Sequence, residues 1–296
     1  MKMEAIKFTS SGETLSGNLF LPENLDKPVP AVTILGPMTF VKEQAPTEYA
    51  KRFAQHGFAS LVFDPRYHGE STGAERRWEH PLAKIADVKA SLDYLSQREG
   101  IDATQLIGMA VCQGSSEMVR AAANDTRIKV VSTVAGHYRD YIGDLEWLGE
   151  ESRESRLAKG WEAKTKYLQH GEIDYVPAVD PERTDVGMPG EFVWNWYSAW
   201  AQKGIWENRY AVMSDADLLT YESLSAMTQL DKPYLMIHSD NSFLPNTAKR
   251  HFDTVKSTEK QLLWEGETAH FQYYDDPNVL DATVVEMVEF FRTHLS

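Results

Sequence analysis

Short runs of apolar, often β-branched residues alternate along most of the chain with segments whose apolar residues recur at helical spacing. The first alternation of polar and apolar residues covers 4–22 and predicts an antiparallel hairpin. Further strands are expected at 31–35, 59–64, 106–111, 128–134, 234–238 and 261–264, and helices at 46–56, 83–98, 115–124, 246–255 and 281–294. Strands that alternate with helices predict an α/β fold, in which a mostly parallel central sheet is flanked by helices on both faces.

This alternation breaks at about Gly136 and resumes near residue 227. Residues 137–226 hold six of the eight tryptophans and many charged side chains. We interpret this stretch as a mostly helical, Trp-rich cap insertion over the carboxyl edge of the sheet. Residues 1–136 and 227–296 would then form the α/β core. An exposed Trp-rich cap is also a candidate surface for a homodimer.

Charge and composition narrow the expected partners and compartment. The 296 residues carry a formal net charge of −14, and nucleic acid and anionic membrane surfaces repel an acidic protein, so neither is an expected partner. The chain begins without the apolar stretch of a signal peptide, and no run approaches the ~18 apolar residues of a membrane span. A single cysteine cannot form an internal disulfide, which fits a cytoplasmic protein. Motifs for metals and nucleotides are missing, so neither a metal nor a cofactor is expected.

The single cysteine lies at the most informative junction between a strand and a helix. Cys112 directly follows the predicted strand 106–111, with Ala110 two residues before it and Gly114 two residues after it. A nucleophile elbow needs small residues at these positions, because the tight turn leaves no room for larger side chains. The helix that follows points its amino end at the sulfur, which favours the thiolate. The backbone N–H of Gln113 would face a developing oxyanion.

Two other strand ends supply the partners that a cysteine nucleophile needs. His270 follows the last predicted strand, where a loop can bring an imidazole over the sulfur as a general base. Asp240 lies just after strand 234–238 and could orient that imidazole. The chain order of nucleophile, acid and base is the order found in α/β-hydrolases. Asp140, after the preceding strand, is the alternative acid.

Two further segments carry a family resemblance. Residues 36–44 read Gly-Pro-Met-Thr-Phe-Val-Lys-Glu-Gln, and residues 63–71 read Phe-Asp-Pro-Arg-Tyr-His-Gly-Glu-Ser. Together with the turn at Cys112, they resemble the α/β-hydrolase superfamily, and within it the bacterial cysteine and serine hydrolases related to dienelactone hydrolase. The resemblance covers roughly 4–136 and 230–295. It implies an α/β-hydrolase fold and cleavage of esters, lactones or related acyl compounds.

The resemblance also assigns roles to the first loop. It implies that the segment after strand 31–35 donates the second oxyanion N–H group, from Met38 or Thr39. The first loop departs from the family, which usually has more glycine and a histidine there. The acid of most members aligns with Ser242, two residues after Asp240. Residues expected to line the substrate pocket are Thr39, His137 and Tyr138.

These residues leave three functions open. The first is a hydrolase that cleaves an ester, lactone or thioester through a Cys-His-Asp triad and an acyl-enzyme on Cys112. The second is an acyltransferase that passes the same acyl group to another acceptor. The third is a non-catalytic binding protein on a hydrolase scaffold, a reading that the altered first loop and the displaced acid support. In the two enzymatic readings the partner is a small acyl compound.

Overall fold

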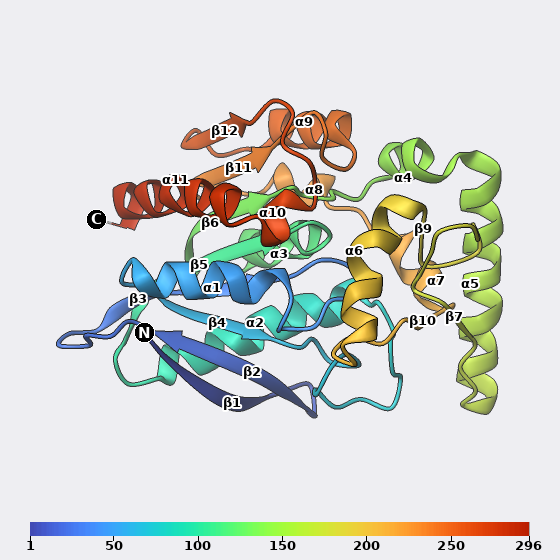
Figure 1. Cartoon of the computed structure of the whole chain (residues 1–296), viewed down its shortest axis with the longest axis horizontal. Coiled ribbons are helices and arrows are strands. Elements are labelled where there is room, and N and C mark those ends of the chain that lie inside the picture. The colour runs from blue at the N-terminus through green and yellow to red at the C-terminus, as the bar shows by residue number, and fades with distance from the viewer. Residues whose placement is uncertain (296) are drawn as a thin grey trace.

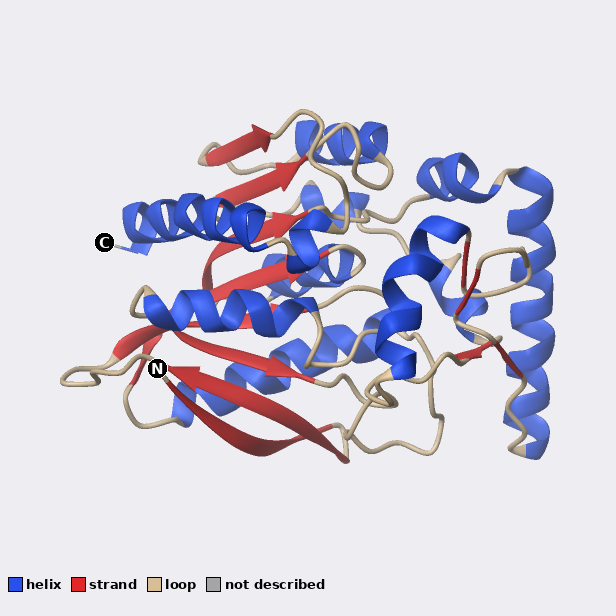
Figure 2. Cartoon of the chain, in the orientation of Figure 1, coloured by secondary structure: helices blue, strands red, loops and turns tan. Residues whose placement is uncertain are grey.

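The computed structural model describes residues 1–295 and is built around one eight-stranded sheet (Figures 1 and 2). The strands run in the order β1-β2-β4-β3-β5-β6-β11-β12. Their bounds are Lys2–Ser10 (β1), Glu13–Leu21 (β2), Val29–Leu35 (β3), Ala59–Phe63 (β4), Ile101–Val111 (β5), Ile128–Val134 (β6), Tyr234–His238 (β11) and Lys260–Trp264 (β12). The pairs from β4 to β12 are parallel, and only the β1–β2 hairpin and its contact with β4 are antiparallel. The predicted mostly parallel sheet is therefore confirmed.

Helices cover both faces of the sheet, because its strands are apolar on both sides. In β3, Ala31 and Leu35 belong to one buried cluster, while Val32 and Ile34 belong to the other. Helices α1 and α11 pack on the second face, and α2, α3 and α9 on the first (Figure 1). Their bounds are Ala45–Gln55 (α1), Pro81–Gln97 (α2), Gly114–Asn124 (α3), Pro245–Thr254 (α9) and Pro277–Leu295 (α11). A strand buried on both faces needs such continuous apolar runs.

Between β6 and β11 the chain leaves the sheet and builds a layer beyond the carboxyl ends of the parallel strands (Figure 1). We call residues 135–233 the cap. Its helices are Tyr141–Leu148 (α4), Glu150–His170 (α5), Glu191–Gln202 (α6), Ser214–Leu218 (α7) and Leu224–Met227 (α8). Helix α8 lies where the chain returns to the core and packs beside α3 and α9 (Figure 1). Two short pairs of strands accompany them: Tyr175–Val176 (β7) with Tyr210–Ala211 (β10), and Val179–Asp180 (β8) with Met188–Pro189 (β9).

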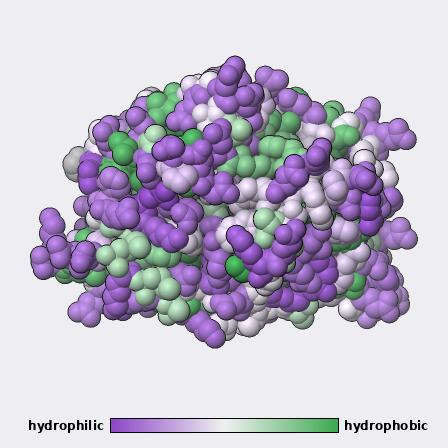
Figure 3. All heavy atoms as spheres, viewed as in Figure 1, coloured by the Kyte–Doolittle hydropathy of each residue, from purple (hydrophilic) through white to green (hydrophobic). Residues whose placement is uncertain are grey.

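Several elements differ in extent from the sequence-based expectation. Strand β5 begins at Ile101 rather than 106, and α11 begins at Pro277 rather than 281. A one-turn helix, Gln272–Asp275 (α10), was not predicted. None of the helices within residues 1–295 combines the length and apolar character that a membrane crossing requires. The face seen in Figure 3 is largely hydrophilic, with a hydrophobic patch over the region where α6 and α10 meet.

Candidate active site

Cys112 forms the turn between β5 and α3 in a strained backbone conformation. Its φ angle is 53°, a left-handed value that is uncommon for residues other than glycine. Neighbouring segments hold it there: the Cys112 N–H donates to Val134 O at 3.2 Å, and the Cys112 carbonyl accepts N–H groups from Ser115 and His137 at 3.0 and 2.9 Å. A strained residue fixed on a strand-to-helix turn is the geometry of a nucleophile elbow.

Gly114 explains why this turn needs a small residue. Its N–H donates to Gly36 O at 3.1 Å, so the start of α3 lies against the end of β3. A Cβ atom added at Gly114 would lie 2.5 Å from Gly36 O and 2.8 Å from Leu35 O. Both are backbone atoms and cannot move aside cheaply. The small residue that the sequence pattern requires is therefore required by the close approach of two backbone segments.

The sulfur of Cys112 is surrounded by hydrogen-bond donors in a buried setting. Burial raises the pKa of the thiol, while the hydroxyl of Tyr274 and the backbone N–H groups of Gln113 and Met38 lower it by a smaller amount. The net direction is upward, because burial outweighs the contribution of the N–H group at the start of α3. The two N–H groups are the ones expected to form the oxyanion hole, and here they face the sulfur.

Of the two candidates on the first loop, Met38 rather than Thr39 directs its N–H toward the sulfur. The N–H of Thr39 instead donates to Glu79 Oε1 at 2.6 Å. Glu79 is fully buried and also binds Lys84 Nζ at 2.5 Å and His68 Nε2 at 3.2 Å. Burial disfavours the Glu79 carboxylate, but the charge of Lys84 and the bond to His68 prevail and hold its pKa well below the usual range. A buried anion therefore fixes the conformation of the oxyanion loop.

His270 lies in the same cavity as Cys112, but a tyrosine stands between them. The Nε2 atom of His270 is 3.0 Å from the hydroxyl of Tyr274, and that hydroxyl also hydrogen-bonds the sulfur of Cys112. On the other side of the ring, Nδ1 is 2.8 Å from Ser242 Oγ and 3.3 Å from the Phe243 backbone nitrogen. Burial, assisted by His238, lowers the pKa of His270 to about 3, so the imidazole is neutral at neutral pH.

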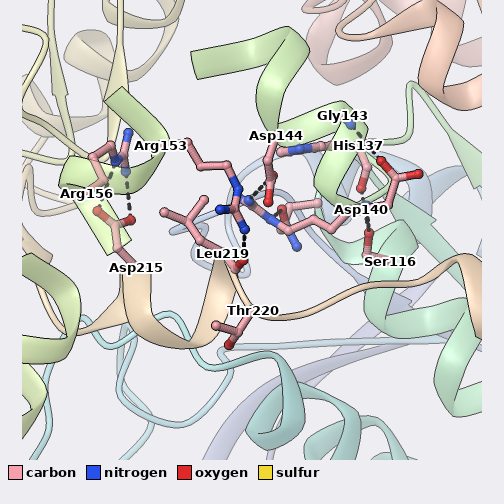
Figure 4. Close-up of polar contacts among 12 residues, drawn as sticks. Ser116, His137, Asp140, Gly143, Asp144, Arg153, Arg156, Asp215, Leu219 and Thr220 are labelled. Atoms are coloured by element: carbon pink, nitrogen blue, oxygen red, sulfur yellow. Dashed lines mark hydrogen bonds and ion pairs between the residues drawn. The ribbon is translucent and has the colours of Figure 1, made fainter. Parts of the chain in front are cut away.

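Neither predicted acid lies against this imidazole, and the expected Cys-His-Asp triad is not assembled. Asp240 has a side chain that is 58% exposed and pairs with Lys249 at 3.3 Å. Asp140 caps the amino end of α4, accepting the Gly143 N–H at 2.6 Å, and binds Arg250 at 2.7 Å (Figure 4). The position that the family resemblance aligned with the acid does meet His270, but it holds Ser242. Both carboxylates instead have structural partners.

The candidate site opens into an apolar cavity of about 270 Å³ under the cap. Cys112, His270, Met38 and His137 line it as expected. The other lining residues come largely from the cap and the loops near α10: Trp147, Met188, Pro189, Phe192, Val193, Tyr197, Phe243, Phe271 and Tyr274. Among residues 1–295, no charged side chain lines this cavity. It is suited to a predominantly apolar group.

Two residues predicted to line the pocket lie elsewhere. The side chain of Thr39 is buried and is not part of the cavity wall. Tyr138 turns into the core, where its hydroxyl lies 2.6 Å from Thr133 Oγ1 and 2.9 Å from the hydroxyl of Tyr234. The sequence placed both at the correct strand ends, but the direction of a side chain in a loop has no periodic signal.

A buried polar network connects the elbow with the cap. The side-chain amide of Gln113 accepts from Arg139 Nε at 2.8 Å and donates to Glu117 at 2.9 Å. Arg139 continues to Asp144 of α4 at 2.9 Å. Figure 4 shows the neighbouring ion pair between Arg156 and Asp215, with an oxygen-to-nitrogen distance of 2.8 Å, which joins α5 to α7. These contacts hold the side chain of Gln113 and join the start of α3 to the cap.

The topology and the elbow together define an α/β-hydrolase fold, and comparison with solved structures shows the same. The crystal structure of a hypothetical protein, PA2218 from Pseudomonas aeruginosa, matches with a TM-score of 0.85 and 22% identity, over 99% of this chain and 94% of that one. The α/β hydrolase GrgF from Penicillium sp. sh18 matches with a TM-score of 0.85 and 21% identity, over 100% and 99%.

Sequence relatives extend the comparison. The uncharacterized protein YcjY from Escherichia coli strain K12 is 25% identical over 100% of both chains. The thiohydrolase aneE from Aspergillus aculeatus is 31% identical over 126 residues, 43% of this chain and 41% of that one. The acyltransferase drtE from Aspergillus calidoustus is 27% identical over 136 residues, 46% and 43% of the two chains. No family model matches the chain.

Tyr274 and Glu79 are the site residues that sequence reasoning missed. Tyr274 lies four residues after His270, a spacing that places both on the same side of a helical turn. That spacing was available in the sequence, but no helix was predicted there. The contact of Glu79 with Thr39 spans 40 positions in the chain, a separation that no local pattern reveals.

Proposed function

We propose that this protein is a hydrolase that cleaves an ester-type bond, above all a thioester, through an acyl-enzyme on Cys112. The observation that carries the proposal is the strained cysteine itself, with φ of 53° and two backbone N–H groups facing its sulfur at the wall of an apolar cavity. Strain of this kind persists only where the surrounding structure imposes it, and it clusters at active sites. A cysteine used only for packing has no need of this conformation.

The contacts of the sulfur supply a route for its proton. The step uses the tautomer of His270 that carries its proton on Nδ1, shared with Ser242 Oγ, which leaves Nε2 free to accept. The thiol proton passes to the hydroxyl oxygen of Tyr274 while the hydroxyl proton of Tyr274 passes to Nε2 of His270. The sulfur then attacks the acyl carbon, and the carbonyl oxygen takes over the N–H groups of Gln113 and Met38 as it becomes an oxyanion. Collapse of this intermediate breaks the bond to the leaving group, which recovers the proton from the imidazolium through Tyr274. Water then attacks the acyl-enzyme, passing its proton along the same route, and releases the acid.

The electrostatics of the site favour a thioester over an oxygen ester. With Ser242 in the place of a carboxylate, nothing negative stabilises the imidazolium, and the pKa of His270 stays low. Such an imidazole is a weak base and takes up a proton with difficulty, so a leaving group that departs without waiting for that proton is favoured. A thiolate departs more readily because the pKa of a thiol is only about 8.5. The thiohydrolase aneE, similar to part of this chain, has a name in keeping with this choice.

The test is to measure the burst and turnover of p-nitrophenyl acetate, thioesters and lactones of the dienelactone type, with Cys112→Ala as the control. Mass spectrometry would identify the acyl group on Cys112. We expect a burst that the variant lacks, with the highest turnover on thioesters. Equal reaction in both proteins, or no acyl adduct with any substrate, would contradict the proposal and favour a non-catalytic binding protein.

A second candidate is an acyltransferase that uses the same acyl-enzyme. It is supported by the acyltransferase drtE among the relatives and by the apolar, capped cavity, which limits access of water to the acyl group. Adding alcohols, amines and thiols to the burst assay separates the two functions. A burst without turnover that an acceptor then releases would favour transfer. Turnover that no acceptor accelerates would favour hydrolysis.

A further inference from the structure

The cavity contains one buried polar side chain that the protein leaves without a partner. Five buried polar side chains line it: Cys112, His137, Tyr197, His270 and Tyr274. Cys112, His270 and Tyr274 are hydrogen-bonded to one another in series, and the Tyr197 hydroxyl donates to Met38 O at 3.0 Å. The imidazole of His137 has no hydrogen bond within residues 1–295. Its Nε2 atom is fully enclosed and out of reach of a bound molecule, so Nδ1 is the ring nitrogen that a ligand in the cavity can meet.

The position of His137 is fixed, so the imidazole cannot move to find a partner. Its N–H donates to Cys112 O at 2.9 Å, and its carbonyl accepts from Ser116 Oγ at 2.8 Å (Figure 4). The edges and faces of Trp147 and Phe243 confine the ring, with centroid distances of 5.5 and 4.9 Å. The side chain is 3% exposed. Its backbone contact with Cys112 also places it beside the candidate nucleophile.

The chemical state of His137 defines what it could bind. Burial, with a smaller contribution from the charge of Arg139, holds its pKa well below the usual range, so the ring is neutral, and its Nδ1 atom serves as either donor or acceptor according to the tautomer. Within the described residues, no charged side chain lines the cavity to accompany a charged ligand. The partner that fits is an uncharged oxygen atom.

We propose that His137 forms a recognition subsite for an acyl group that carries an uncharged oxygen substituent, a hydroxyl or a keto group, on an otherwise apolar chain. The inference rests on the proposed function, because it describes the acyl portion of the same substrate. The rest of the cavity wall supplies apolar contacts for the chain. The imidazole supplies the one directional contact and thereby selects an oxygenated acyl group over its unsubstituted analogue.

The experiment compares kcat/KM for three N-acetylcysteamine thioesters of the same chain length: unsubstituted, hydroxylated and keto-substituted, with the substituent moved along the chain. For the wild type we expect at least one oxygenated thioester to be preferred about tenfold or more over the unsubstituted one, the ratio that one well-formed hydrogen bond supplies. Preference for the hydroxyl alone or for both groups identifies which atom of the substrate is bound. In H137F the ratio should fall to near one.

Phe192→Leu is the matched control, because Phe192 lines the cavity without contacting His137 and should change all rates while keeping the ratio. Acetate is too short to need the subsite, so a burst with p-nitrophenyl acetate shows that H137F retains an active Cys112. If H137F does not fold, the same measurements are made with H137L. A burst in the wild type without any oxygen preference, or a preference that H137F keeps, would overturn the subsite alone. No burst in the wild type would overturn the proposed function instead.

Discussion

Ser242 and His270 are joined by a hydrogen bond of 2.8 Å between Ser242 Oγ and His270 Nδ1. This is the contact that a carboxylate makes in a Ser-His-Asp or Cys-His-Asp triad, where it orients the imidazole and stabilises its charged form. A hydroxyl can orient the ring but carries no charge. On the Nδ1 side of His270 the site therefore resembles a triad in geometry and differs from it in electrostatics.

Replacing Ser242 with aspartate should create the missing acid. A carboxylate beside Nδ1 favours the imidazolium, so the pKa of His270 should rise from about 3 toward its ordinary range, and the acylation burst should become at least about tenfold faster. Titration of the imidazole by NMR and stopped-flow measurement of the burst check both effects. Asp240→Asn, which removes an exposed carboxylate paired with Lys249, should change neither. A raised pKa with an unchanged burst would mean that His270 does not limit acylation.

The hydroxyl of Tyr274 should be required for transfer of the thiol proton. Tyr274→Phe keeps the ring in place but breaks both the bond to Cys112 and the 3.0 Å bond to His270 Nε2. We expect the acylation rate to fall about 100-fold, the lower range for loss of a general acid–base group, with little change in the unfolding midpoint. Tyr273→Phe removes the same atom from the adjacent buried tyrosine outside the cavity and serves as the control. Equal effects of the two variants would speak against the relay.

Glu117 should make the protein less stable as pH rises. Burial raises its pKa in the folded state to about 7, above the usual value near 4.5, so the folded protein binds a proton that the unfolded chain releases. Stability is then lost between about pH 4.5 and pH 7 and stays low above that, with a total loss of about 3 kcal/mol.

Glu117→Gln removes this dependence while keeping an oxygen for the side chain of Gln113. Urea unfolding at pH 5 and pH 8 should show similar stabilities for the two proteins at pH 5 and a more stable variant at pH 8. A wild type whose stability lacks this fall would show that Glu117 is ionised in the folded state.

Gly114→Ala should destabilise the elbow by about 2 kcal/mol, because the new methyl group would lie 2.5 Å from Gly36 O. Gly108→Ala, on the preceding strand, is the matched comparison: its new methyl would meet Met118 Sδ at 2.7 Å, a flexible side-chain atom. We expect a cost of about 1 kcal/mol there. Thermal or urea unfolding measures both, and a larger loss from Gly108→Ala would contradict the backbone argument.

The sheet and the elbow could be predicted from the sequence because both depend on local patterns. Buried strands such as β4 and β11 consist of short apolar runs that the sequence shows directly. The Ala-x-Cys-x-Gly spacing around Cys112 reflects a turn only a few residues long. His270 could be placed because the last strand fixes where its loop begins. These features need no knowledge of how distant segments pack.

The remaining parts of the site depend on packing between distant segments. Whether Asp240 or Ser242 meets His270 is decided by a two-residue difference within a loop, where no periodicity constrains the direction of a side chain. Glu79 decides whether Met38 or Thr39 directs its N–H toward the sulfur, because it binds the N–H of Thr39 from 40 residues away in the sequence. The pKa of Cys112 is raised because the cap buries its sulfur. The helix that favours the thiolate can be predicted from the sequence, but this burial cannot.

The cap is bonded directly to the backbone of the loop that carries Met38 and Thr39. The hydroxyl of Tyr197 donates to Met38 O at 3.0 Å, and Trp206 Nε1 donates to Thr39 O at 2.7 Å. A hinged opening of the cap would break both bonds and displace the N–H group that faces the sulfur. We therefore expect the cap to behave as a fixed wall, and small molecules to enter and leave by rotation of rim side chains such as Phe192, which is 49% exposed. The rate at which small molecules enter and leave the cavity would then be set by the size of a few rim side chains. Substitutions at the rim would change this rate without altering the catalytic groups.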